Sequence, residues 1–256
     1  MPEPLVLLPG LQSDHRSWVN QTRHFSASRQ VIVPQRHQHC DTMAAMVERV
    51  LEQLPPRFHL AAWSMGGYIA LQMLPHLAGR LLSLTLISTS ARPEDPASTA
   101  RRMEILDLAE REGMAASNRR TMSQACLDFD ALDAHIRAGL RDASVELGLE
   151  AYRGQQGAII GRPDSRGVLR LVDCPTLILV GDQDSVTPPE CSLEIHESVP
   201  GSRYVVIPDC GHCAPLEYPA VVNQLLDEWL SLQDLPEPAD TQTPPAGALR
   251  GPRWWA

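Results

Sequence analysis

The sequence has 256 residues, of which 43% are hydrophobic and 21% charged, a composition typical of a globular protein with one sizeable core. Its formal net charge of −9 provides no basic patch for a nucleic-acid backbone or an anionic membrane, so neither is expected as a partner. All 22 basic residues are arginine, which excludes lysine Schiff bases, a Walker A lysine and Ser–Lys dyads. Acid and base catalysis would therefore fall to histidine, carboxylates, cysteine or tyrosine.

The first residues do not resemble a secretion signal, because they have no basic region and their apolar run, residues 5–8, is very short. No stretch approaches the roughly 20 apolar residues that a membrane helix needs. We therefore expect a cytoplasmic protein, not bound to a membrane, whose six cysteines are reduced.

Short β-rich runs alternate with helical patterns along the chain, which predicts a doubly wound α/β fold with a mainly parallel, six-stranded sheet. The predicted strands are residues 4–8, 30–33, 58–63, 82–88, 176–180 and 203–207. Helices are predicted at residues 43–54, 65–77 and 221–232, the first with Asp41 or Thr42 as its N-cap.

The segment between the fourth and fifth strands, residues 91–172, is about twice as long as a crossover needs and is helical in pattern. We interpret it as a helical cap inserted into a core formed by residues 1–90 and 173–232. Its predicted helices are residues 98–112, 115–126, 132–140 and 143–160, with interruptions at Gly113, Gly139 and residues 161–164. Residues 233–256 are rich in proline and polar residues and are predicted to be a disordered tail.

The strongest local motif is residues 60–68, Leu-Ala-Ala-Trp-Ser-Met-Gly-Gly-Tyr, in which a strand turns through Ser64 directly into a helix. It matches the nucleophile turn G-x-S-x-G except that Ala62 replaces the first glycine. Such a turn holds the serine oxygen above the sheet edge and places the Met65 amide at a helix N-terminus, where an oxyanion is favoured.

The candidate base is His212, in a loop between the last predicted strand and the last predicted helix. The candidate acid is Asp184, which follows the fifth strand and would hold the His212 tautomer and stabilise its imidazolium form. Asp182 is the rival acid, disfavoured because the spacing from Gly181 to Asp184 matches the usual turn. Asp209, close to His212 in sequence, is interpreted as a turn former.

A second oxyanion donor is expected after the first strand, where the loop reads Leu-Pro-Gly-Leu from residue 8. The Leu11 amide would supply it. The pocket above Ser64 is expected to be lined by the following side chains: Trp63, Met103, Leu106, Met122 and Tyr152.

These motifs resemble those of α/β-hydrolases, in particular the group that contains enol-lactonases, small carboxylesterases and meta-cleavage-product hydrolases. The resemblance covers residues 4–232 and includes the turn at 9–11, the Ser64 turn, Ser-Ala-Arg-Pro at 90–93, Gly-Arg-Pro-Asp-Ser at 161–165, the Asp184 turn and the His212 loop. The chain order serine, acid, histidine is the order used by these enzymes. The resemblance also implies that the sheet has no antiparallel N-terminal hairpin.

From these residues we predict a cofactor-free serine hydrolase that cleaves a carboxylic ester, lactone or thioester through an acyl-enzyme, with water as second substrate. Acyl transfer on the same triad is an alternative, as is C–C cleavage of a vinylogous diketone, for which Arg92 or Arg162 would supply an acid pocket. A binding module without turnover is the least favoured alternative. The oligomeric state and the natural substrate are left open.

Two cysteines flank the candidate base in Cys210-Gly211-His212-Cys213, which has the spacing of a metal knuckle. No second ligand pair lies near it in the sequence, so no metal role is predicted. A disulfide across this turn is not expected either, because it would strain the loop that carries His212.

Overall fold

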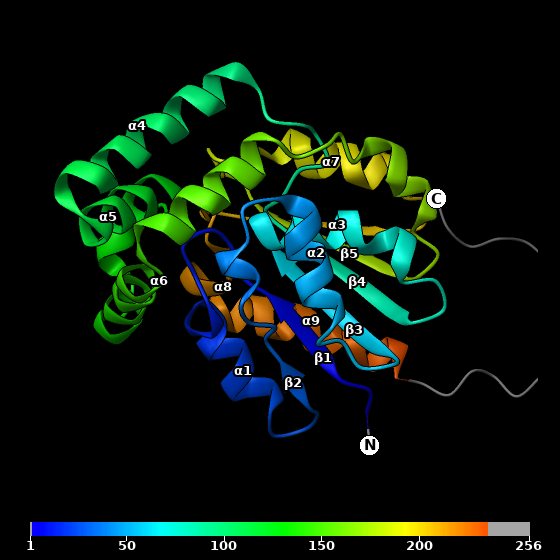
Figure 1. Cartoon of the computed structure of the whole chain (residues 1–256). Helices are drawn as coiled ribbons and strands as arrows, with labels where there is room; N and C mark the ends of the chain where they lie inside the picture. The colour runs from blue at the N-terminus through cyan, green and yellow to red at the C-terminus, as the bar shows by residue number, and fades with distance from the viewer. Residues whose placement is uncertain (1, 235–256) are drawn as a thin grey trace, which may run out of the picture.

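The computed structural model describes residues 2–234 and contains one six-stranded sheet in the order β2-β1-β3-β4-β5-β6 (Figure 1). All neighbouring strands are parallel. The strands are β1 (Leu5–Leu8), β2 (Val31–Ile32), β3 (Phe58–Trp63), β4 (Leu81–Ile87), β5 (Thr176–Gly181) and β6 (Arg203–Ile207). The predicted fold class and strand number are confirmed.

The centre of the sheet is buried on both faces because its strands are apolar at consecutive positions. β1, β3 and β5 are buried throughout. Alternate residues face opposite sides: Leu60 and Ala62 belong to one core cluster, whereas Ala61 and Trp63 belong to the other. Near-continuous apolar runs of this kind are typical of parallel strands covered by helices on both sides.

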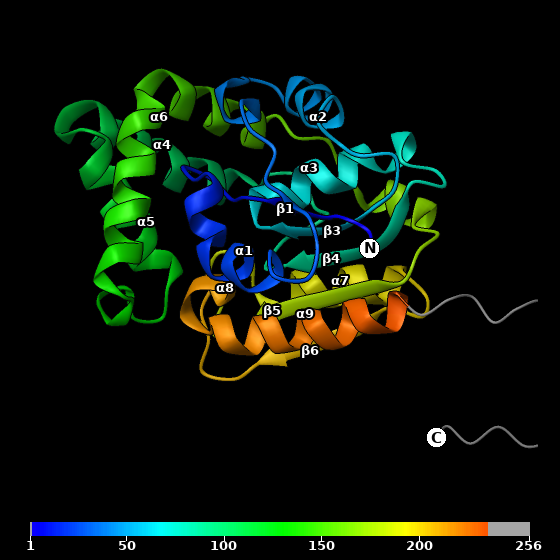
Figure 2. The same ribbon diagram turned by 90° about the horizontal axis from the view of Figure 1, so that it is seen from below.

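Helices cover both faces of the sheet, as the view from below shows (Figure 2). One face is covered by α2 (Met43–Leu51), α3 (Met65–Met73) and α7 (Pro189–Ser198). The other is covered by α1 (Val19–Phe25), α8 (Ala214–Glu217) and α9 (Pro219–Gln233). Short 3-10 helices occur at η1 (His15–Trp18), η2 (His37–His39), η3 (Leu74–His76) and η5 (Arg166–Leu171).

Three helices follow β4 and lie together at one end of the sheet in both views (Figures 1 and 2). They are α4 (Pro96–Glu112), α5 (Met114–Ala125) and α6 (Ala134–Ile160), with η4 (Phe129–Ala131) between the last two. Asp95 caps α4 by accepting a hydrogen bond from the Ser98 amide, and Gly113, at φ 88°, separates α4 from α5. These helices occupy the segment for which a cap was predicted.

The break predicted at Gly139 is wrong, because Gly139 lies within α6 and the helix kinks at Gly148 instead. Gly148 has φ 79°, a left-handed value that glycine adopts without steric cost. Thr42, and not Asp41, caps α2 through its side-chain oxygen.

The helices α1 and α7 were not predicted. Each buries few side chains, Gln21 and Phe25 in α1 and Cys191, Ser192 and Ile195 in α7, which leaves little apolar periodicity to detect. Most of the predicted tail lies outside the described residues; residue 233 is the last of α9. No described helix has the length and apolar character needed to span a membrane.

Candidate active site

Ser64 lies at a strained turn between β3 and α3. Its φ of 55° and ψ of −118° are unusual for a residue with a side chain, and such strain persists only where the surroundings hold it. The Ser64 amide donates to the Ile87 carbonyl at 3.0 Å, and the Thr89 hydroxyl donates to the Ser64 carbonyl at 2.9 Å. Both partners belong to β4 or to the loop after it, so the neighbouring strand fixes the turn.

Two glycines allow α3 to approach this closely. A Cβ atom at Gly66 would lie 2.4 Å from the Leu8 carbonyl oxygen, and one at Gly67 would lie 2.3 Å from the Thr89 hydroxyl oxygen. Any larger residue would push α3 away from β1 or β4. The motif therefore needs glycine at these two positions for packing.

His212 is held in the loop after β6 by contacts from two other parts of the chain. Its backbone amide donates to the Ala125 carbonyl at the end of α5 at 2.8 Å, and its carbonyl accepts from the Trp63 indole at 2.9 Å. Gly181, at the end of β5, allows the loop to pass close by, because a Cβ there would lie 2.2 Å from the carbonyls of Cys210 and Gly211.

The structure brings Ser64, His212 and Asp184 together. Nε2 of His212 lies 2.8 Å from the Ser64 hydroxyl oxygen, and Nδ1 lies 3.0 and 2.9 Å from the two Asp184 carboxylate oxygens. The Asp184 and His212 side chains are almost fully buried, while Ser64 is partly accessible. This hydrogen-bonded chain has the geometry of a nucleophile, a base and an orienting acid.

Asp184 is fixed by its own turn. It accepts hydrogen bonds from the amides of Val186 and Thr187, each at 2.9 Å, and from the Thr187 hydroxyl at 3.0 Å. Burial alone would raise the pKa of Asp184, but the positive charge of protonated His212 and these hydrogen bonds lower it below its usual value. Asp184 therefore stays ionised to a lower pH than an ordinary aspartate.

The rival acids point elsewhere. Asp182 is exposed and accepts a hydrogen bond from the Cys210 amide at 3.2 Å. Asp209 is exposed and has φ 53°, as expected of a turn residue. Neither contacts the His212 imidazole among the described residues.

The two amides predicted as oxyanion donors are those of Leu11 and Met65. Gly10 and Leu11 line the cavity beside Ser64, and Met65 is the first residue of α3. The next amide in the loop, Gln12, is already occupied, because it donates to the Gln155 side chain at 3.0 Å. In the described part of the chain the Leu11 and Met65 amides have no such acceptor.

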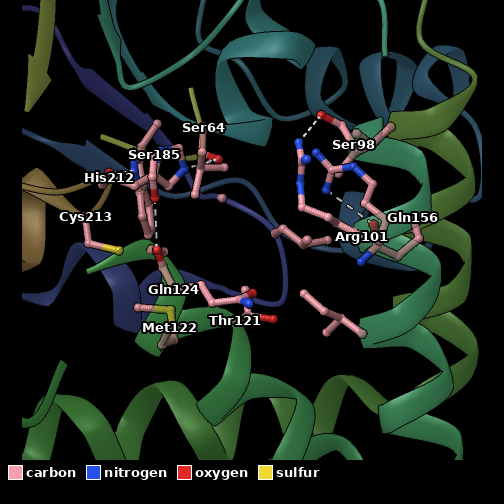
Figure 3. Close-up of a pocket in the computed structure, with 18 of the residues that line it drawn as sticks. Ser64, Ser98, Arg101, Thr121, Met122, Gln124, Gln156, Ser185, His212 and Cys213 are labelled. Carbon is pink, nitrogen blue, oxygen red and sulfur yellow. Dashed lines mark hydrogen bonds between the residues drawn. The ribbon is translucent and has the colours of Figure 1, made fainter. Parts of the chain in front are cut away.

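A cavity of about 350 Å³ opens beside Ser64 and His212 (Figure 3). Of the predicted liners, Trp63, Met122 and Tyr152 line it. Met103 does not, because its side of α4 faces solvent and it is 50% exposed. Leu106 does not line it either, because it packs in a separate cluster with Ala109, Met114 and Tyr152.

Most of the lining contributed by the helices after β4 was not predicted. Those residues are Ser98, Arg101, Arg102, Ile105, Thr121, Gln124, Ala125, Gln156 and Ile159. The spacing of Ser98, Arg101, Arg102 and Ile105 places them on one face of a helix and could have marked a polar, cavity-facing side of α4.

The two arginines considered for an acid pocket, Arg92 and Arg162, do not line the cavity. Arg92 pairs with Glu194 at 2.8 Å, and Arg162 pairs with Glu94. The C–C cleavage alternative therefore loses the residues that were proposed for it.

Glu217 ties the His212 loop to the segment after α5. Its carboxylate accepts hydrogen bonds from the amides of Leu127 at 2.7 Å, Gly211 at 3.2 Å and Cys213 at 2.9 Å. Among the described residues, the possible ligand atoms of Cys126, Cys213 and Glu217 lie within 4.8 Å of one another. Because three amides already occupy the carboxylate and burial raises the pKa of the Cys213 thiol well above its usual value, we interpret this group as a structural clamp.

The chain belongs to the alpha/beta hydrolase family, whose model matches residues 5–225. It is similar to the pimeloyl-[acyl-carrier protein] methyl ester esterase of Nitrosospira multiformis, with 30% identity over 187 residues, 68% of each chain. A thermophilic esterase from Thermogutta terrifontis has a similar structure, with a TM-score of 0.81, 29% identity and 92% of each chain covered.

The enol-lactonase from Burkholderia xenovorans LB400 shares the fold, with a TM-score of 0.76 and 23% identity over 90% of this chain and 92% of that one. The match of the family model to residues 5–225 confirms the α/β-hydrolase family that the motifs indicated.

Proposed function

We propose that the protein is a serine esterase that hydrolyses a carboxylic ester through an acyl-enzyme on Ser64. The proposal rests above all on the continuous hydrogen-bonded chain from the Ser64 hydroxyl through His212 to Asp184. The names of the relatives, which include methyl ester esterases and an esterase of similar structure, agree with this class. The predicted class of carboxylester hydrolase is confirmed at that level.

In the proposed first half-reaction, Nε2 of His212 takes the proton of Ser64 while its oxygen attacks the ester carbonyl. The amides of Leu11 and Met65 hold the resulting oxyanion, and Asp184 stabilises the imidazolium. Collapse of the tetrahedral intermediate breaks the bond between the acyl carbon and the alcohol oxygen, and the alcohol leaves with the proton from His212. Water then repeats the sequence on the acyl-enzyme and releases the acid.

The relatives suggest which esters to test first. Several are named as esterases of a methyl ester carried on an acyl-carrier protein, so simple alkyl esters of longer acyl chains are the substrates of first choice. A substrate attached to an acyl-carrier protein, a lactone or a thioester would use the same steps.

The test is hydrolysis of a series of p-nitrophenyl and methyl esters of increasing acyl length by wild-type protein and Ser64→Ala. We expect turnover by the wild type and a loss of at least about 10³-fold in kcat for Ser64→Ala, with unchanged thermal unfolding. Undiminished turnover by Ser64→Ala would refute the assignment.

A further inference from the structure

The end of the cavity that lies across from Ser64 is cationic. Of the described residues that line the cavity, two are arginines, Arg101 and Arg102, and none is an aspartate or glutamate. Arg101 and Ser98 lie on α4, across the open space from Ser64 and His212 (Figure 3). Apolar residues, among them Leu11 and Ile105, line the cavity as well.

Arg102 belongs to a buried ion cluster that carries one uncompensated positive charge. Its Nε donates to Glu94 at 2.5 Å, and the same carboxylate pairs with Arg162. The side chains of Arg102, Glu94 and Arg162 are only 17%, 2% and 8% exposed. A buried charge without a partner is unfavourable, so this cluster favours a further anion nearby.

The two arginines of the cluster differ in which of their N–H groups have an acceptor. Arg162 also donates to the carbonyls of Arg92 and Ile159, and its guanidinium lies 4.3 Å from the Tyr68 ring centre, a cation–π contact. Arg102 donates from Nη1 to Gln156 at 3.4 Å. Within the described residues its Nη2 has no acceptor, and Arg102 is the member of the pair that lines the cavity.

Arg101 adds a second guanidinium to the same end. It donates to the Ser98 hydroxyl at 2.7 Å, and that hydroxyl donates to Asp95 at 2.5 Å. Asp95 does not line the cavity, and its carboxylate is occupied by capping α4. Three guanidiniums, those of Arg101, Arg102 and Arg162, therefore lie near two carboxylates, those of Glu94 and Asp95. Neither carboxylate lines the cavity.

We propose that Arg101 and Arg102 form a subsite for a carboxylate at the end of the substrate remote from the scissile ester. The substrates would be esters with an apolar middle and a terminal carboxylate. The planar guanidinium fork matches a carboxylate, and charge-assisted hydrogen bonds of this kind are stronger than neutral ones. The inference rests on the proposed function, because it takes Ser64 as the reacting end of the cavity.

The direct test compares two esters of equal acyl length, mono-p-nitrophenyl adipate and p-nitrophenyl hexanoate, which differ by the terminal carboxylate. We expect kcat/KM to be about tenfold higher for the adipate ester at low salt, the effect of one charge-assisted contact. The preference should weaken as ionic strength rises, because Arg101 is exposed.

The variants Arg101→Gln and Arg102→Gln should remove the preference, measured as the ratio of kcat/KM for the adipate ester to kcat/KM for the hexanoate ester, and Arg101→Glu should reverse it. Arg111→Gln is the matched control, an exposed arginine of the same helix that does not line the cavity. Because Arg102 also holds Glu94, thermal unfolding is measured in parallel. If Arg102→Gln is unfolded, Arg101→Gln and Arg101→Glu carry the test.

Binding to the Ser64→Ala protein separates this inference from the proposed function. Tighter binding of monomethyl adipate than of methyl hexanoate, measured by calorimetry and lost in the Arg101 variants, supports the subsite whether or not turnover is found. Equal binding of the two esters, or a preference that survives in both arginine variants, would overturn it. If the wild-type protein hydrolyses none of the esters, this result would instead contradict the esterase assignment.

Discussion

Ser64 depends on backbone strain as much as on its partners. The positive φ of this residue directs the hydroxyl above the end of β3, and the hydrogen bonds to Ile87 and from Thr89 maintain that conformation. In the proposed mechanism, the Met65 amide at the start of α3 would be one of the two donors to the oxyanion. The turn at Ser64 therefore holds both the proposed nucleophile and the Met65 amide, one of the two proposed oxyanion donors.

At this scale we expect Asp184→Asn to lower kcat by about 10³- to 10⁴-fold while the protein stays folded, because an amide would favour the wrong His212 tautomer. Asp182→Asn is the matched control, since Asp182 is exposed and its carboxylate accepts a hydrogen bond from the Cys210 amide. Steady-state kinetics on one p-nitrophenyl ester decide the matter. A comparable loss for both variants would contradict the choice of acid.

At the scale of elements, the site is assembled from loops that follow three parallel strands. Ser64 follows β3, Asp184 follows β5 and His212 follows β6, so all three meet at the carboxyl edge of the sheet. Ligand sites in parallel sheets lie at this edge because the strand ends and helix starts converge there. The Pro-Gly turn after β1 reaches the same edge.

The clamp formed by Glu217 couples the His212 loop to the helices after β4. We expect Glu217→Ala to lower the free energy of unfolding by roughly 3 kcal/mol, because three amides lose a charged acceptor. We expect kcat to fall more than KM changes, because α4 and α6, which supply much of the cavity lining, carry none of the amides bound to Glu217, whereas the His212 loop carries two of them.

Glu228→Ala, an exposed glutamate of α9, is the control for this variant. Urea unfolding and steady-state kinetics are measured on both proteins. Unchanged stability and kcat in Glu217→Ala would show that the hydrogen bonds to Leu127, Gly211 and Cys213 do not position the loop.

The elements that could be predicted from sequence are those whose signals are local. The strands are mostly apolar runs. Ser64 is the residue after β3, and Asp184 and His212 lie three and five residues after the ends of β5 and β6. The cavity lining could not be predicted in the same way, because it depends on how α4 rotates against its neighbours. Met103 faces solvent, whereas Arg101 and Ile105, two residues away on either side, face the cavity.

Helix α7 illustrates a second limit. Its buried face is formed by Cys191, Ser192 and Ile195, which sequence periodicity does not separate from a polar loop. The kink of α6 is a third limit on prediction from sequence. Gly139 and Gly148 are both glycines of this helix, but only Gly148 departs from helical geometry. Only the packing of the helix determines which glycine adopts a positive φ.

At the scale of the whole molecule, one buried histidine makes stability depend on pH. His37, in η2, is fully buried, and neither ring nitrogen has a hydrogen-bond partner among the described residues. Burial, aided by the charge of His39, lowers the pKa of His37 from 6.5 to about 4. Between these values the unfolded chain binds a proton that the folded protein does not.

We therefore expect the stabilisation from neutral His37 to be fully present above pH 6.5. As the pH falls toward 4, protonation of His37 in the unfolded chain should lower the free energy of unfolding by on the order of 3 kcal/mol. His37→Leu should flatten that part of the profile, whereas His39→Gln, at an exposed position, removes the smaller cause of the pKa shift and should flatten it much less. Urea unfolding from pH 5 to pH 8 measures both slopes. Parallel profiles for wild type and His37→Leu would contradict the expectation.

Covalent labelling with a fluorophosphonate shows whether Ser64 is a nucleophile activated by His212, and this reaction requires no knowledge of the substrate. We predict a single adduct, located by peptide mass spectrometry on Ser64, that forms rapidly in folded wild-type protein and is absent or greatly slowed in Ser64→Ala and His212→Ala. Folded wild-type protein that stays unlabelled, or an adduct that forms equally well in Ser64→Ala, would contradict the assignment of Ser64 as the nucleophile.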